Sequence, residues 1–294
     1  MTAAVSSASI DLSSIDLSYA SPCDSRLTRA LVHLIEATTG QPELKRLYNT
    51  YQTELRGTVD FWEAAMGLMR LSVAYDAAKL DALPRTGPLV IVANHPFGLI
   101  DGLLIGHLAN RVRRDFKVLT NSRLYPPDAE IRSYILPIDF DPTPTAQAIN
   151  LDSRAVARRH IKSGGCIIVF PAGGVATTPS FFARKAVDFE WKPFTARLVH
   201  EAKTHVVPIF FPGQNSRMFQ IASHIGMTTR MAYLLHEVAN KIGGSFSAVI
   251  GDVLPYDALK EMRDPRVLCR YLRDRTEALS ANPWIEDHIG NVLG

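Results

Sequence analysis

Cysteine is scarce in this sequence. Only Cys23, Cys166 and Cys269 among the 294 residues carry a thiol, and they lie far apart. They form no Cys-x-x-Cys pair and no zinc-ligand spacing, which argues against a disulfide-stabilised scaffold and a structural zinc site. Free thiols fit a reducing compartment such as the cytosol. Cys166 opens an apolar run, so we expect it in the core.

Long apolar runs are also missing. No stretch approaches the ~20 residues that a membrane-spanning helix needs, and runs such as 89–93 have the length of a strand. The first residues show neither the basic nor the long apolar region of a secretory signal. Residues 1–25 are rich in serine, and we expect a flexible arm there. We therefore expect a cytoplasmic protein whose membrane contact is peripheral, on the inner face.

No excess of charge of one sign is present. Lysine and arginine number 32 and aspartate and glutamate 29, so the formal net charge is only +3. This balance does not indicate a nucleic-acid partner. The nine histidines show no metal-ligand spacing, and the chain has no GxSxG, P-loop or GxGxxG motif. We expect no metal and no cofactor. The absence of these motifs argues against a serine hydrolase, a nucleoside triphosphatase and a dinucleotide-dependent enzyme.

What the sequence does contain is a regular alternation of short apolar runs and amphipathic stretches after residue 84. Hydrophobic residues make up 47% of the chain, enough for a sizeable core. The predicted strands are 89–93, 117–120, 134–138, 166–170, 206–211 and 246–250. The predicted helices are 101–116, 145–163, 194–203, 230–241 and 256–279. The alternation predicts an α/β fold over 84–294, with a central, mixed but mostly parallel sheet covered by helices on both faces.

Residues 26–83 carry helical periodicity. Leu27, Leu31, Leu34 and Ile35 recur at helix spacing, and the same pattern continues after residue 60. We expect two or three amphipathic helices that form an N-terminal layer on the core. The alternative is a surface that lies on a bilayer and inserts apolar side chains into it. The inserted residues would be Phe61, Trp62, Met66 and Met69.

The densest chemical signal is Asn-His-Pro-Phe-Gly-Leu-Ile-Asp-Gly, residues 94–102. A buried strand precedes it and a helix follows, and ligands bind at the carboxyl ends of strands in α/β sheets. Asp101 falls in the first turn of that helix and is close enough in sequence to reach His95. Such a bond fixes the tautomer and leaves the other ring nitrogen free as a base. We expect the pair within hydrogen-bond reach, beside an apolar groove. The alternative is that both residues only cap their elements.

The Asn94-His95 pair followed by Asp101 resembles the catalytic motif of the glycerolphosphate acyltransferase superfamily, in the branch of haemolysin-like and ornithine-lipid acyltransferases. Five residues separate His and Asp here, where four are usual. Two further blocks resemble the family, at 167–174 and 206–216. The resemblance implies that His95 and Asp101 are catalytic, with backbone amides near Gly98 or Gly173 at the oxyanion. The implied substrate-binding residues are Asn94, Gly98, Arg123, Phe170, Pro171, Gly173, Gly174, Lys185 and Asn215.

Two positions depart from the family pattern. Ala172 stands where the family has a glutamate, and Asp139 where it has an arginine that helps to hold the acceptor phosphate. These changes favour an acceptor with another head group, such as a lyso-aminolipid. Arg123, Arg154 or Lys185 would be able to supply the missing charge. The alternative is that each is a solvated surface cation.

The resemblance thus implies an O-acyltransferase. It would move a fatty acyl group from acyl-ACP or acyl-CoA to the hydroxyl of a lyso-lipid in membrane lipid biosynthesis. One alternative is a thioesterase or lipase-like hydrolase that uses the same His-Asp pair with water. Another is a non-catalytic lipid-binding protein.

Overall fold

The computed structural model describes residues 40–122 and 128–285. The expected flexible arm 1–25 and the helical pattern around Leu31 lie outside these residues. Seven strands of the described chain form one sheet in the order β1-β7-β6-β2-β5-β3-β4. They are β1 (Ser72–Tyr75), β2 (Leu89–Ala93), β3 (Phe116–Asn121), β4 (Ile135–Ile138), β5 (Cys166–Val169), β6 (His205–Phe210) and β7 (Ser245–Ile250).

The sheet is mixed and mostly parallel, as the sequence predicts. Strands β6, β2, β5, β3 and β4 run parallel to one another. Strand β7 is antiparallel to β6, and β1 is parallel to β7. Strand β2 lies at the centre and all five of its residues are buried. A continuous apolar run is typical of a central parallel strand, because helices cover both of its faces.

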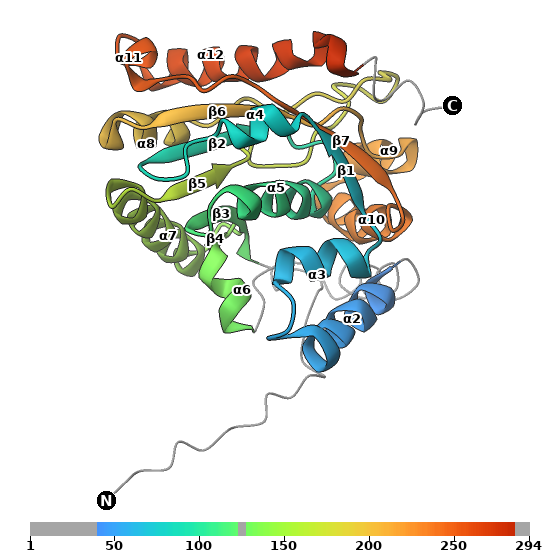
Figure 1. The fold of residues 1–294 in the computed structure, drawn as a ribbon. Helices are drawn as coiled ribbons and strands as arrows, with labels where there is room; N and C mark the ends of the chain where they lie inside the picture. Colours follow the sequence, from blue (N-terminus) through green and yellow to red (C-terminus); the bar gives the residue numbers. More distant parts are fainter. Residues whose placement is uncertain (1–39, 123–127, 286–294) are drawn as a thin grey trace, which may run out of the picture.

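Helices pack on both faces of the sheet (Figure 1). One face buries apolar residues of the helices α2, α3, α5, α9 and α10. The other buries residues of α7, α8, α11 and α12. The helices are α2 (Gln41–Thr50), α3 (Phe61–Leu68), α4 (Ala77–Asp81), α5 (Leu99–Val112), α6 (Ala129–Tyr134), α7 (Pro144–Lys162), α8 (Phe194–Ala202), α9 (Arg217–Ile225), α10 (Met227–Asn240), α11 (Tyr256–Leu259) and α12 (Pro265–Ala278).

The N-terminal layer packs on the core rather than presenting its large apolar residues to a bilayer. Trp62, Met66 and Met69 are buried, and the Trp62 ring lies 5.3 Å from that of Phe116 between centroids. Gly106 of α5 makes room for the indole, since a Cβ there would stand 2.1 Å from the ring. Insertion of these side chains into a membrane is therefore wrong. Phe61 is partly buried against the same core.

Some element boundaries differ from the sequence prediction. The segment 26–83 is not entirely helical, because Ser72–Tyr75 forms β1, an edge strand with little burial. The predicted helix 256–279 divides into α11 and α12, since Pro265 lacks an N–H and starts a new helix after the cap Asp264. Helices α6 and α9 have no counterpart in the prediction. Residue Phe116 begins β3 rather than ending a helix.

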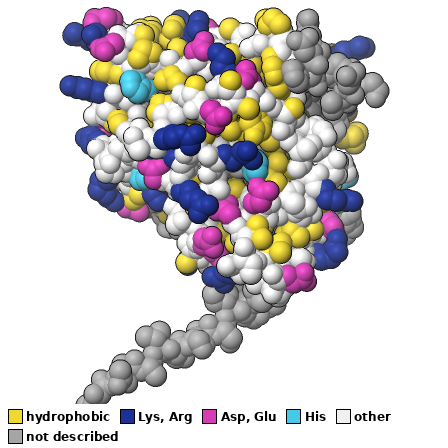
Figure 2. Space-filling view, viewed as in Figure 1, with side chains coloured by type: hydrophobic (Ala, Val, Ile, Leu, Met, Phe, Trp, Pro, Cys, Tyr) yellow, Lys and Arg dark blue, Asp and Glu magenta, His cyan; other side chains and the backbone are white. Residues whose placement is uncertain are grey.

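Charged side chains are interspersed over the surface shown in Figure 2, where basic and acidic residues lie among one another, as the near balance of charge predicts. Among the described helices, none combines the length and apolarity required to cross a bilayer.

Candidate active site

His95 and Asp101 meet at the carboxyl end of β2. The strand ends at Ala93, a turn follows, and α5 begins at Leu99. The turn brings Nδ1 of His95 to 2.9 Å from Oδ2 of Asp101. A carboxylate only accepts hydrogen bonds, so Nδ1 carries the proton in the neutral ring and Nε2 is left unprotonated. The predicted hydrogen bond is present.

Asp101 is completely buried, although it is a charged residue. Its Oδ2 also accepts hydrogen bonds from the backbone N–H groups of Phe97, at 2.8 Å, and Gly98, at 2.9 Å. Burial raises the pKa of Asp101 above its ordinary value, while the bonds from His95, Phe97 and Gly98 oppose this shift. The carboxylate is thereby fixed in one orientation, and it fixes the imidazole in turn.

The imidazole of His95 remains partly open to solvent. Its side chain is 18% exposed, and the ring of Phe170 stacks on it with centroids 4.2 Å apart and planes inclined by 25°. Phe170 follows β5, the strand beside β2, so the sheet brings the first two sequence blocks together. With Asp101 at Nδ1 and Phe170 on one ring face, Nε2 is the nitrogen left to act on a substrate.

Hydrogen bonds and a glycine fix the turn that carries His95. Asn94 donates from Nδ2 to the carbonyl of Phe211 at 2.9 Å, and its Oδ1 accepts from the Phe211 N–H at 2.7 Å. Both polar groups of the Asn94 side chain thus bind the end of β6. Gly98 has a φ of 78°, and a Cβ there would lie 2.7 Å from Leu234. A glycine is required at this position by conformation and by space.

The block 167–174 ends in a turn after β5. Gly173 has a φ of 71°, and its N–H donates to the carbonyl of Phe170 at 3.0 Å. Pro171 is buried and its carbonyl accepts from Lys192. The N–H groups of Gly98 and Gly173 are both bonded within the protein, so the oxyanion amides expected near these residues are not assigned to either of them. Ala172, in place of the family glutamate, is buried in the core.

Asp188 is a site residue that the sequence analysis missed. Its Oδ1 accepts from the backbone N–H of His95 at 3.1 Å, and its Oδ2 accepts from Nε1 of Trp191 at 3.1 Å. Burial raises the pKa of Asp188, and these two hydrogen bonds oppose the shift. The carbonyl of His95 is also bound, since it accepts a hydrogen bond from the N–H of Ala176 at 2.7 Å. Nothing in the local sequence pattern links Asp188 to His95.

A buried cation lies beside the second block. Arg230 of α10 is 7% exposed, donates to the carbonyl of Val175, and stacks over Phe189 at 5.1 Å. A Cβ on Gly174 would lie 3.5 Å from its guanidinium. Burial lowers the pKa of Arg230 to about 10. No ion pair between Arg230 and a carboxylate is found in the described part of the chain.

The remaining predicted residues are dispersed. Asn215 is buried, and neither polar atom of its side-chain amide has a hydrogen-bond partner among the described residues. Lys185 is exposed in the loop before α8, and Arg123 lies outside the described residues. Arg154 is on α7, over the ring of Phe194. Asp139 bonds through its backbone to Asn150, so this position forms part of a turn.

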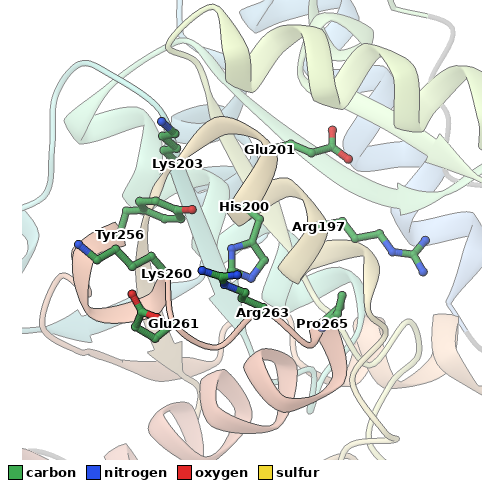
Figure 3. Close-up of a pocket in the computed structure, with 9 residues that line it drawn as sticks. All are labelled: Arg197, His200, Glu201, Lys203, Tyr256, Lys260, Glu261, Arg263 and Pro265. Atoms are coloured by element: carbon green, nitrogen blue, oxygen red, sulfur yellow. The ribbon is translucent and has the colours of Figure 1, made fainter.

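Two cavities of the described residues lie away from His95, and the apolar groove expected beside it stays a prediction. A cavity of about 580 Å³ lies between α8 and α11 and is lined largely by charged side chains (Figure 3). Lys203, which lines this cavity, comes just before the start of β6, whereas His95 follows the end of the parallel strand β2. The cavity therefore lies at the opposite end of the strands from His95. A second, of about 130 Å³, lies beside β7. No group of three metal-ligating side chains occurs within residues 40–122 and 128–285.

Curated relatives and a solved structure resemble this chain. The lyso-glycine lipid O-acyltransferase of Bacteroides thetaiotaomicron is 26% identical over 84% of this chain and 89% of its own. The enzyme with the same name from Phocaeicola vulgatus is 26% identical over 74% and 76%. The 1-acyl-sn-glycerophosphate (LPA) acyltransferase PlsC from Thermotoga maritima has a TM-score of 0.48 and 14% identity, covering 92% of this chain and 90% of its own.

A family profile described as "Acyltransferase" matches residues 47–282. The match includes the His95–Asp101 turn, both later blocks and all seven strands. Because it spans well over half of the chain, this protein belongs to that acyltransferase family and is an acyltransferase.

Proposed function

We propose that this acyltransferase moves a fatty acyl group from an acyl thioester, acyl-ACP or acyl-CoA, to the hydroxyl of a lyso-lipid in membrane lipid biosynthesis. The observation that carries the proposal is the hydrogen bond of 2.9 Å between His95 and Asp101. It leaves Nε2 as a base on a partly exposed ring. A base aimed at an acceptor hydroxyl needs no serine or cysteine nucleophile, because the hydroxyl itself attacks.

In the proposed reaction, His95 Nε2 takes the proton of the acceptor hydroxyl as its oxygen attacks the thioester carbonyl. The new C–O bond replaces the C–S bond, and the thiolate leaves with the proton that His95 returns. Asp101 stabilises the imidazolium that forms between these steps. The Phe170 ring, stacked on the imidazole, would restrict its rotation and so help to keep Nε2 directed at the acceptor.

For the acceptor we propose a lyso-aminolipid with an acidic head group, in keeping with the substitutions at Ala172 and Asp139. Two relatives are named for a lyso-glycine lipid. Glycine has no side-chain hydroxyl, so the hydroxyl that accepts the acyl group would lie on the fatty part of such a lipid. A glycine joined through its nitrogen keeps a carboxylate, and Arg230 beside Gly174 is a buried cation without a carboxylate partner in the described chain. We assign the head group to Arg230.

A product assay tests the proposal. The purified full-length protein is given labelled acyl-ACP or acyl-CoA with an N-(hydroxyacyl)glycine, an N-(hydroxyacyl)ornithine or lysophosphatidic acid. We expect a diacylated aminolipid, and we expect His95→Ala to abolish its formation while the circular dichroism spectrum stays unchanged. Free fatty acid as the sole product supports the alternative hydrolase. Lipid binding without turnover on any donor supports a non-catalytic protein. Wild-type turnover in His95→Ala rejects the mechanism.

We also place the protein at the inner face of the cytoplasmic membrane. Acyl thioesters are water-soluble donors of the cytoplasm, whereas a lyso-lipid with a long chain stays in the bilayer. An enzyme that joins them works at the boundary, and peripheral binding suffices for that. Fractionation of cells that express the tagged protein, with a salt wash of the membranes, distinguishes peripheral binding from a fully soluble state.

A further inference from the structure

A hairpin between β5 and α8 exposes large apolar side chains. Thr177 and Val187 pair in antiparallel fashion, with N···O distances of 3.2 and 2.9 Å, and close the loop between them. At its tip Phe182 is 87% exposed and Phe181 47%. Ten large hydrophobic residues are exposed in the described chain, and six belong to this hairpin, its flank or α9. The six form what we call the hairpin face: Phe181, Phe182, Val187, Phe189, Met218 and Ile225.

Helix α9 packs against the hairpin and extends the hairpin face. The ring of Phe181 lies 5.6 Å from that of Phe182 and 6.2 Å from that of His224, between centroids. Nε2 of His224 lies 2.9 Å from the hydroxyl of Thr178. Ile225 follows His224 and is 70% exposed. The hairpin tip and the C-terminal end of α9 thus lie side by side, and both carry exposed apolar side chains.

Protein side chains satisfy the polar backbone of the hairpin. This matters because an unpaired N–H or C=O is costly in an apolar medium, whereas a paired one is tolerated. The backbone is held by three side chains that come from α9 and the loop before it. The hydrogen bonds run from Arg217 to the carbonyls of Phe181 and Ala183, from Ala186 N–H to Gln214, from Gln214 to the carbonyl of Arg184, and from Thr178 N–H to Gln220.

The charges around the hairpin face are mainly basic. Arg184 and Lys185 are exposed next to the phenylalanines at the tip, and α9 contains no acidic residue. Asp188 points inward to His95, which leaves Glu190 as the exposed acid of the segment 177–191. Projecting aromatic side chains beside basic ones are the combination that binds an anionic lipid surface, where rings enter the interface and cations stay with the head groups.

We propose that the hairpin face, with Arg184 and Lys185, docks this protein on an anionic lipid bilayer. Docking would also hold the candidate active site close to the bilayer. The two arms of the hairpin flank the His95 peptide, since Ala176 N–H binds its carbonyl and Asp188 accepts from its N–H. Four to five residues separate this base from the tip, a span on the order of 15 Å. Lipid bound at the tip is thus within reach of the His95 site.

Vesicle binding of the full-length protein tests the proposal without depending on the proposed acyl transfer. We expect binding to vesicles of phosphatidylcholine with phosphatidylglycerol and little binding to phosphatidylcholine alone. Phe182→Ser should weaken binding about tenfold or more, since one buried phenylalanine contributes about that factor. Arg184→Gln should weaken binding several-fold, to phosphatidylglycerol vesicles only. The matched control is Leu151→Ser, which changes another exposed apolar residue, on α7 and 66% exposed.

A second measurement reports how deeply the hairpin tip enters the bilayer. Tryptophan introduced as Phe182→Trp should be quenched by lipids brominated on their acyl chains, and Leu151→Trp should not. Equal binding of Phe182→Ser and wild type, or no binding of wild type, overturns the proposal. Sedimentation of a dimer that Phe182→Ser dissolves would assign the face to a second copy instead, which also overturns it. Acyl transfer to a water-soluble short-chain acceptor is measured in parallel, so that a failure of docking is distinguished from a failure of the proposed function.

Discussion

Asp101 holds the imidazole of His95 through one carboxylate oxygen. Oδ2 lies 2.9 Å from Nδ1 of His95 and accepts two backbone N–H groups as well. Oδ1 is buried and has no hydrogen-bond partner among the described residues. The other oxygen therefore both fixes the turn and orients the ring. The geometry of the pair and the conformation of residues 97–98 depend on the same atom.

Asp101→Asn should show what the negative charge of Asp101 contributes, because asparagine has nearly the same shape. The amide oxygen of asparagine takes the place of Oδ2, so the three hydrogen bonds are kept, but the negative charge that stabilises an imidazolium is lost. We expect kcat to fall by about 10²- to 10⁴-fold. Burial already disfavours the charge of Asp101 and raises its pKa. Removing that charge offsets the cost of burying the amide NH2 where Oδ1 has no partner, so the melting temperature should change little. Rates and thermal unfolding on one preparation check both statements, and unchanged kcat would contradict the role of the carboxylate.

Gly98→Ala should destabilise the protein more than Gly57→Ala. Both glycines have a φ of 78°, but nothing lies within 4 Å of a Cβ on Gly57, whereas a Cβ on Gly98 would meet Leu234 at 2.7 Å and Val175 at 3.2 Å. A positive φ is unfavourable for alanine in both variants. Overpacking adds about 1–3 kcal/mol at Gly98 alone. Urea unfolding of the two variants gives the difference, and equal values would show that Leu234 moves aside freely.

Glu237→Gln should change how stability depends on pH. Glu237 of α10 is buried, and it binds Lys241 at 2.7 Å and the N–H of Ser216 at 3.0 Å. Burial alone would raise the pKa of Glu237, but the hydrogen bonds from Lys241 and Ser216 outweigh it and lower the pKa below 4.5. The ionised side chain therefore stabilises the fold at neutral pH. This contribution begins to fade as the pH falls to about 4.5 and disappears below the folded-state pKa.

For this variant we expect a loss of about 1–3 kcal/mol in the free energy of unfolding at neutral pH. The difference from wild type should shrink as the solution is acidified below pH 4.5, the ordinary value of the group. Denaturant titrations at several pH values measure it. Glu261→Gln, an exposed position on the far side of the sheet, serves as the control and should show no such trend. A gap that stays constant with pH would exclude ionised Glu237 as its source.

Arg230→Met tests the proposed head-group contact. Methionine keeps the apolar packing on Phe189 but has no charge. We expect KM for an acidic acceptor to rise about tenfold to a hundredfold, the effect of losing a charge-assisted hydrogen bond. KM for the acyl donor should stay constant. Arg154→Met, which also removes an arginine stacked on a phenylalanine, is the control. A parallel rise of KM for donor and acceptor would reject the assignment.

The central strands and the His95–Asp101 turn are predictable from local sequence. Strand β2 is a five-residue apolar run, and its bounds, 89–93, agree with the prediction. Asp101 falls in the first turn of α5 as expected. The edge strand β1 is harder to predict from sequence. Strand β1 has a weak pattern, because its residues are half exposed, and its partner β7 lies far away in the chain. Helix α9 follows the cap Ser216, a local signal that was present in the sequence.

The sequence by itself determined which residues are placed at the carboxyl end of β2, because the strand, the turn and the helix cap are local. It also determined that the sheet is covered on both faces, since its central strands are apolar throughout. Tertiary structure alone decided that Phe170 stacks on His95, that Asp188 accepts from its N–H, and that Trp62 is in the core. These contacts join segments far apart in the chain. They depend on the strand order of the sheet, which no local spacing encodes.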